Sequence, residues 1–120
     1  MKTRVGLLSS LLRFDKPLNQ ILEPLAKFGW DSDQELVVLT RQQAADVLAR
    51  YLKGELTASD VESWANALEC RDDVGLEAGY QDLVREVVHE LANPLLTRSL
   101  SAVTAKDWIQ RLTTVPWNSG

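Results

Sequence analysis

The single histidine, His89, belongs to two patterns with the spacing of metal ligands. Glu86 and His89 have the i, i+3 spacing of carboxylate-bridged di-iron bundles, in which each of two helices supplies one such pair. The chain has no second histidine to complete a second pair. His89 and Glu90 also begin a His-Glu-x-x-His zinc motif, but Asn93 stands where the second histidine must be. We therefore predict no metal site and expect His89 to be a surface or interface residue.

The run from Asp31 to Glu35 has the alternating acidic residues that open a calcium-binding loop. Such a loop needs glycine at its sixth position and a bidentate glutamate at its twelfth, whereas this chain has Leu36 and Gln42 there. A solvated turn next to a helix cap explains the run better, so no calcium site is predicted.

Patterns for covalent or phosphate chemistry are missing from the sequence. There is no glycine-rich phosphate loop and no nucleophile elbow, and a serine triad would depend on the one histidine. Cys70 has no cationic cluster around it apart from Arg71, so a reactive thiol is not supported and we expect Cys70 to be buried. The chain is predicted not to be an enzyme and to need no cofactor. The alternative, a small enzyme, would need a concave pocket with convergent polar groups. The spacing of apolar residues in a sequence cannot reveal such a pocket.

Acidic side chains are concentrated in the middle of the chain. Residues 55–90 carry ten carboxylates and two arginines, whereas the rest of the chain carries seven acidic and eleven basic side chains. Such segregation predicts an acidic face for a basic partner. The alternative is that glutamate-rich helix faces are simply solvated. The basic N-terminus has only a few cations, so direct binding of nucleic acid is not expected; they are Lys2, Arg4, Arg13 and Lys16.

A chain of 120 residues predicts a single domain, residues 1–120, with one core. One cysteine can form no disulfide within the chain, which favours a cytoplasmic location. The apolar segment Val5–Leu12 is closed by Arg13 and Asp15 and no cleavage site follows, so a signal peptide is not expected. No apolar run reaches the roughly 20 residues that a membrane-spanning helix needs.

Helix signals are clearest in the middle of the chain. Thr40 and Gln43 make a capping-box pattern before a stripe of apolar residues at helical spacing. Thr57 and Ser59 are both plausible N-caps of a second amphipathic helix that contains Trp64. Because a short connection leaves consecutive helices side by side, these two are predicted to form a central antiparallel hairpin.

Further helices are expected from Tyr80 to Leu91 and from Ser101 or Thr104 to Leu112. Leu18–Phe28 also has helical spacing, with Pro24 as a kink or restart. The sequence therefore predicts an all-α, single-domain bundle of four to six helices.

Two features of this bundle stay open at the sequence level. The apolar run Leu36–Leu39 is too short to assign, and no second strand is evident to pair with it. Trp64 and Trp108 fall on apolar helix faces and are expected in the core. Trp30 and Trp117 can each cover the edge of the core or anchor a partner.

The segments Leu39–Arg41, Val47–Thr57 and Asp60–Ala65 resemble a group of small helical bacterial proteins. Arg71–Gly75 and His89–Pro94 extend the resemblance. Members of this group are mostly of unassigned function. Some proteins of this size and helical character serve as immunity proteins for polymorphic toxins, including contact-dependent inhibition toxins, and the resemblance implies this role without carrying any site residue across.

Charge and resemblance together predict a cytoplasmic immunity protein, a monomer or weak homodimer, that neutralises a basic toxin domain, most simply a nuclease. A nuclease cleft must be positive to attract phosphate, so an acidic helical face would be drawn to it and would occlude it. The contacts are predicted to come from eight residues: Glu62, Glu69, Asp72, Asp73, Glu77, Asp82, Glu86 and Glu90.

Reversal of Asp72 and Asp73 to lysine is expected to weaken such binding without unfolding the protein. The alternative function is a homo-oligomeric or adaptor bundle with no toxin partner, whose acidic surface only keeps it soluble and whose N-terminal apolar residues form the contact. Salt-sensitive binding to a different protein favours the inhibitor, whereas a salt-insensitive dimer favours the adaptor.

Overall fold

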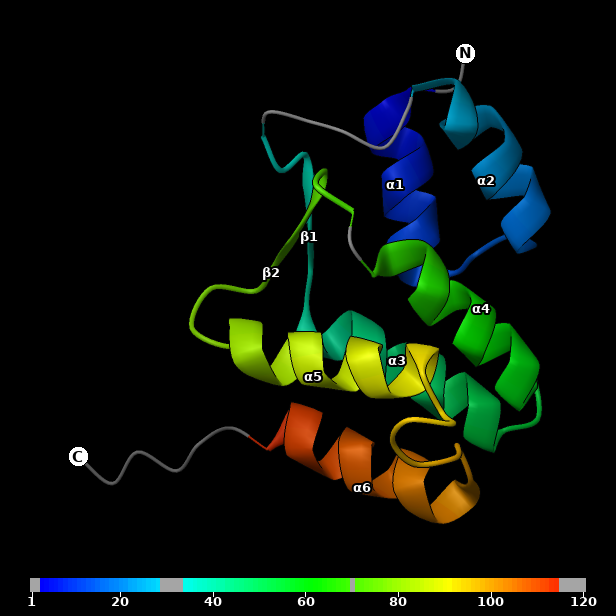
Figure 1. Cartoon of the computed structure of the whole chain (residues 1–120), viewed down its shortest axis with the longest axis vertical. Helices are drawn as coiled ribbons and strands as arrows, with labels where there is room; N and C mark the ends of the chain where they lie inside the picture. The colour runs from blue at the N-terminus through cyan, green and yellow to red at the C-terminus, as the bar shows by residue number, and fades with distance from the viewer. Residues whose placement is uncertain (1–2, 29–33, 70, 115–120) are drawn as a thin grey trace.

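The computed structural model describes residues 3–28, 34–69 and 71–114. Within these ranges the chain is mostly helical, as the sequence predicts, and Figure 1 shows how the elements follow one another. Their bounds, in chain order, are α1 Arg4–Arg13, α2 Leu18–Leu25, the 3-10 helix η1 Ala26–Phe28, β1 Val37–Leu39, α3 Arg41–Leu52, α4 Ala58–Leu68, β2 Val74–Leu76, α5 Gln81–Ala92 and α6 Ala102–Thr113.

The expectation of an all-α fold is wrong in one respect, because β1 and β2 form a small parallel sheet. Val37 lies opposite Val74 and Leu39 opposite Leu76. The strands are joined through α3 and α4, since parallel strands need a long crossover connection. Each strand has three residues, which is too short for an alternating pattern to be recognised in the sequence.

Side chains at the helix starts fix several of the element boundaries. Thr40 and Gln43 form the predicted capping box of α3. Thr57, and not Ser59, caps α4, and its box is completed by Asp60. Each box satisfies two backbone N–H groups that the first helical turn leaves without a partner.

The first part of the chain is helical as well. α1 has Thr3 as its N-cap and Phe14 as its C-cap, and the φ of 51° at Phe14 is left-handed. Pro24 lies inside α2, which continues as η1. The apolar face of α1 is buried in the core through Leu7, Leu8, Leu11 and Leu12. These leucines are therefore unavailable for the intermolecular contact that the adaptor alternative assigned to the N-terminal segment.

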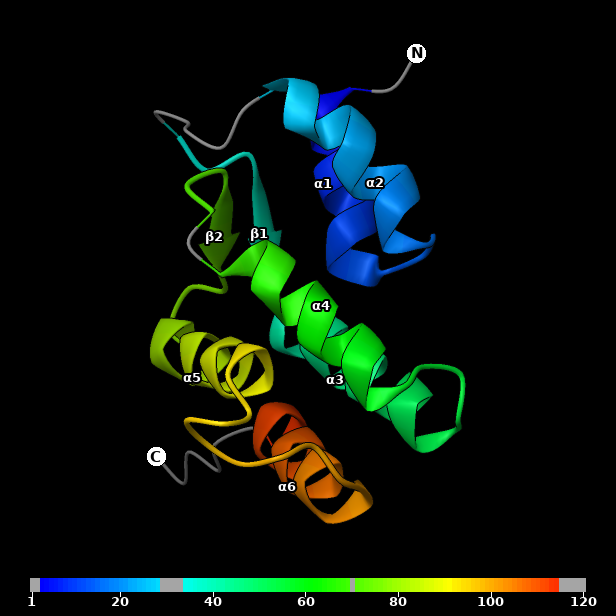
Figure 2. The same cartoon turned by 45° about the vertical axis from the view of Figure 1, so that its right-hand side comes forward.

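One of the three main helix pairs joins helices that are distant in sequence. α3 packs chiefly on α6 and α4 chiefly on α5, while α1 packs on α2. In Figures 1 and 2, α1 and α2 occupy one end of the molecule, α5 and α6 the other, and the two strands lie side by side between them. The central antiparallel hairpin expected of α3 and α4 is therefore not confirmed.

The two predicted core tryptophans, Trp64 and Trp108, are both fully buried. Trp64 Nε1 donates a hydrogen bond of 2.7 Å to the backbone oxygen of Leu11 and so joins α4 to α1. Trp30 and Trp117, Cys70 and the Asp31–Asp33 part of the calcium-like run lie outside the described residues. Of the helices that the structure describes, none has the length and apolar character needed to cross a membrane.

Candidate protein-binding groove

A groove with a cavity volume of about 760 Å³ lies between the small sheet, the end of α4 and one face of α5. Its size falls in the range of about 300–1,000 Å³ typical of ligand pockets. Five apolar residues from both strands and both helices line it: Leu39, Leu68, Val74, Leu76 and Val88. Six polar residues complete the lining: Glu35, Glu69, Arg71, Arg85, His89 and Asn93.

One stripe of α5 supplies much of the polar lining. Arg85 and His89 are four residues apart, and Asn93, the C-cap of α5, continues the same spacing. Residues at this spacing share one face of a helix. Val88 is buried beside them, so the groove has an apolar floor next to a polar rim.

Glu69, the C-cap of α4, connects α4 to the end of α5. Its Oε2 lies 2.9 Å from His89 Nδ1, and its Oε1 accepts a hydrogen bond of 3.2 Å from Asn93 Nδ2. Glu86, which the di-iron spacing paired with His89, faces α6 instead, and its Oε2 lies 3.5 Å from Arg111 Nη2. The spacing therefore reflects a shared helix and not a shared ligand.

The wall beside β2 is held by a buried ion cluster. Asp73 is completely buried and accepts hydrogen bonds of 2.9 and 3.0 Å from Arg71, and Arg4 Nη2 lies 3.0 Å from the same carboxylate. Burial on its own would raise the pKa of Asp73, but the hydrogen bonds from Arg71 and Arg4 outweigh it and hold that pKa below its ordinary value.

Glu35 lies over β2 at the position of Gly75. A Cβ atom at Gly75 would collide with the Glu35 carboxylate, so the glycine lets this side chain approach the strand closely. Among the described residues, Glu35 has neither a hydrogen-bond nor an ion-pair partner for its carboxylate. Its charge is therefore open to a group from outside the chain.

Five of the eight predicted contact residues form ion pairs with arginines of the chain, and three of the five, Asp73, Glu77 and Glu90, are also buried or half-buried. Asp73 is buried as described, so its carboxylate is not presented to a partner. Glu77 accepts hydrogen bonds from the backbone and side chain of Arg41, which lower its pKa. Glu90 accepts both Arg98 Nε, at 3.2 Å, and Trp108 Nε1.

The basic residues outside the acidic segment account for much of this pairing. Arg4, Arg41, Arg98 and Arg111 bind Asp73, Glu77, Glu90 and Glu86, and Arg50 lies 3.5 Å from Glu55. The charge segregation seen in the sequence is thus partly neutralised by folding, because the basic remainder folds back on the acidic middle.

Of the remaining predicted contacts, Glu69 lines the groove and the other four are exposed on α4, on α5 or before β2. Asp72 is exposed beside the lining residue Arg71. Asp82 and Glu86 are exposed on α5 near Arg85, and Asp82 Oδ1 lies 3.1 Å from Arg85 Nη1. Glu62 is exposed on α4, two turns before Glu69 on the same helix face.

Sequence reasoning missed Glu35, Arg85 and Asn93 as members of the site. The i, i+4 spacing of Arg85, His89 and Asn93 is a signal that could have marked them as one helix face. No local signal could have placed Glu35, since its position depends on the pairing of β1 with β2. Among the residues that the structure describes, no three His, Cys, Asp or Glu side chains are arranged to hold a metal ion.

No protein-family model, curated protein or solved structure matches this chain. The resemblance to immunity proteins therefore stays a prediction.

Proposed function

We propose that this chain is an immunity-type inhibitor that binds a basic toxin domain, most simply a nuclease, through the groove and the carboxylates around it. The observation that supports the proposal is an apolar-floored groove whose lining includes two carboxylates, Glu35 and Glu69, that have no lysine or arginine partner among the described residues. An apolar centre inside a polar rim is the usual anatomy of a protein–protein interface. An excess of negative charge around such a centre also steers a basic partner into contact.

The charge of this surface favours a basic partner even after the internal ion pairs are subtracted. Glu35, Glu62 and Asp72 have no arginine or lysine partner among the described residues. The two arginines of the groove lining are each matched by a carboxylate, Asp73 for Arg71 and Asp82 for Arg85. Arg4 shares Asp73 with Arg71, so that cluster keeps one positive charge, but the three carboxylates without a lysine or arginine partner outnumber it and leave this surface negative.

The double reversal of Asp72 and Asp73 to lysine does not test this proposal cleanly. Lysine at position 73 would bury a third cation beside Arg4 and Arg71, so loss of binding would follow from unfolding. Exposed positions are better suited, and Glu62→Lys with Glu86→Lys reverses two of them on α4 and α5.

A pull-down from the native lysate with this double variant tests the proposal. We expect the wild-type chain to recover one basic protein in stoichiometric amount at low salt and to lose it at high salt, and to inhibit the activity of that protein. The variant should fail to recover it at low salt. The matched control is Glu23→Lys with Asp46→Lys, which reverses two exposed carboxylates on α2 and α3 and should bind as the wild type does. Equal recovery by both variants would contradict the proposal.

A second function, a homo-oligomeric bundle, is favoured by one observation. Leu95 and Leu96, between α5 and α6, are 97 % and 79 % exposed. Adjacent exposed leucines can form a contact between copies of a chain. Sedimentation of Leu95→Ser with Leu96→Ser distinguishes this function, because a dimer that dissociates in the variant would support it, and a wild-type monomer would exclude it.

A further inference from the structure

We infer that the groove recognises a lysine or arginine side chain flanked by an apolar residue in the partner protein. This inference deepens the proposed function and rests on it for the identity of the partner. It assigns the apolar floor to the aliphatic part of the bound segment and two carboxylates, Glu35 and Glu69, to its cation.

The charge pairing of the lining supports a cationic occupant. Both lining arginines already have a carboxylate, whereas neither Glu35 nor Glu69 has a lysine or arginine partner among the described residues. Among the described residues, the Glu69 carboxylate accepts hydrogen bonds only from His89 and Asn93. A carboxylate has about four acceptor sites, so Glu69 keeps capacity for a further donor.

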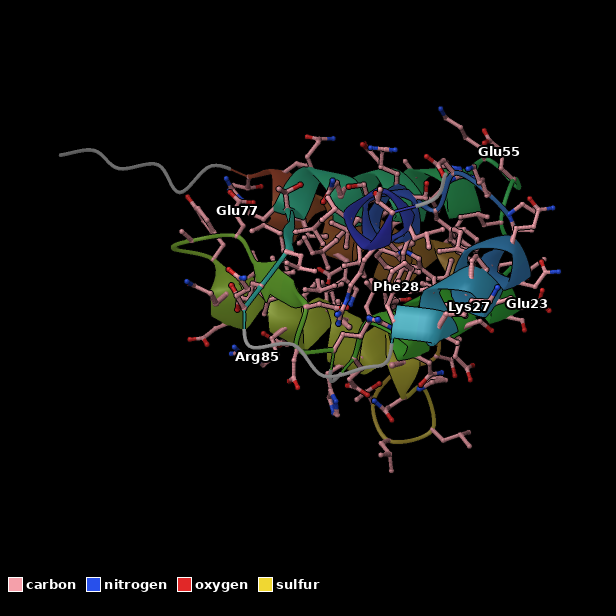
Figure 3. All side chains as sticks on the ribbon, turned by 90° about the horizontal axis from the view of Figure 1, so that it is seen from above. Glu23, Lys27, Phe28, Glu55, Glu77 and Arg85 are labelled. Atoms are coloured by element: carbon pink, nitrogen blue, oxygen red, sulfur yellow. The ribbon has the colours of Figure 1, made fainter. Side chains whose placement is uncertain are left out.

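Arg85 does not block a cation from entering. Its side chain is 64 % exposed and bound to Asp82, and Figure 3 shows it projecting outward, at the opposite side of the view from Glu23 and Lys27. Arg71 is covered by Asp73, with 3 % of its side chain exposed. The carboxylates of Glu35 and Glu69 are therefore the charged groups that an incoming side chain meets.

The apolar floor matches the stem of such a side chain. Lysine and arginine carry three or four methylene groups below the charge, and these groups pack on apolar surface while the head reaches polar partners. Leu68, Val74 and Val88 offer that surface, and the volume of about 760 Å³ leaves room for a neighbouring apolar residue. Hydrogen bonds from a cation to a carboxylate are stronger than neutral ones, so the charged head would supply selectivity.

Titration of the ¹⁵N-labelled full chain with two short peptides, followed by NMR, tests the inference. The probes are N-acetyl-Leu-Lys-Leu-amide and the same peptide with acetylated lysine, which keeps the stem and removes the charge. We expect the charged peptide to shift the amide signals of Glu35, Glu69, Gly75 and His89, and the acetylated peptide to bind about tenfold more weakly.

Three variants locate the binding site. Glu35→Gln with Glu69→Gln should weaken binding of the charged peptide about tenfold, and Glu23→Gln with Asp46→Gln should leave it unchanged. Gly75→Ala keeps every charge but forces the Glu35 carboxylate off the strand, so it should weaken binding while the protein stays folded by circular dichroism.

Equal binding of both peptides, or shifts confined to residues outside the groove, would overturn the inference. The proposed function fails separately. If the wild type recovers a basic partner that the variant with Glu62 and Glu86 reversed does not recover, but neither peptide binds in the groove, the inference is wrong and the proposed function stands. A charged peptide bound in the groove, with no basic protein recovered from the lysate, would overturn the proposed function alone.

Discussion

Arg4 Nε and Nη2 lie 3.1 and 3.0 Å from Asp73 Oδ2, and this contact joins the first turn of α1 to the residue before β2. The two residues are 69 positions apart in sequence. Because Arg71 binds the same carboxylate, one acidic group holds the N-terminal helix, the sheet and one wall of the groove together.

Asp73→Asn should destabilise the protein by about 3–5 kcal/mol, since it removes the charge that Arg4 and Arg71 share in a buried site. Urea unfolding followed by circular dichroism measures the change. The neighbouring exposed residue provides the control, because Asp72→Asn should change the stability by no more than about 0.5 kcal/mol. Similar losses for the two variants would mean that the buried pairing contributes nothing specific.

The same carboxylate should make the stability depend on pH in the acid range. The pKa of Asp73 is lower in the folded protein than its unfolded value of about 3.9, so the folded state binds fewer protons between the two values. The stabilisation is complete above the unfolded pKa and is lost as the pH falls through the folded one. Unfolding free energies measured from pH 6 downward should fall more steeply for the wild type than for Asp73→Asn; parallel curves would contradict this.

Glu77 should stabilise the start of α3. It accepts a hydrogen bond of 2.8 Å from the backbone N–H of Arg41, the first residue of that helix, and also binds the Arg41 side chain, which lies over the ring of Tyr80. Glu77→Ala should lower the free energy of unfolding by about 1–2 kcal/mol and speed amide exchange in the first turn of α3. Glu77→Gln retains an acceptor oxygen and should lower the free energy of unfolding less. Equal amide exchange in the two variants would show that the hydrogen bond from the Arg41 N–H to residue 77 does not stabilise the first turn.

Trp108 should be coupled energetically to Glu90. Its Nε1 donates to the Glu90 carboxylate, and the guanidinium of Arg111 lies 4.2 Å from its ring centroid. A double-mutant cycle with Trp108→Phe and Glu90→Ala should give a coupling energy of about 1–2 kcal/mol in urea unfolding. Additive effects of the two substitutions would show that the contact has no net energetic role.

Much of the helical framework could be predicted because its signals are local. The capping box of Thr40 and Gln43 marks the start of α3, and the apolar spacing around Trp64 and Trp108 identifies two faces of the core correctly. Each of these features depends on residues within one or two helical turns.

The sheet and most of the site could not be predicted, because they depend on contacts between distant residues. In the sequence, Val74 belongs to a segment that only interrupts the helical spacing, and its place in a strand depends on pairing with the distant Val37. The acidic pattern of residues 55–90 is visible in the sequence, but Arg4 and Arg41 bind two of its carboxylates, so less of its charge is available to a partner. Counting charges along a chain does not reveal which of them cancel after folding.

Photo-crosslinking in the native cell is the most direct test of the central claim, that the groove side of the molecule binds a basic protein. A photoreactive phenylalanine analogue is placed at Asp72, which is exposed beside the groove, or at Glu23, which is exposed on α2. We predict that position 72 crosslinks to one basic protein and that position 23 does not. Crosslinks of equal yield from both positions, or crosslinks from position 72 only to a second copy of this chain, would contradict the account.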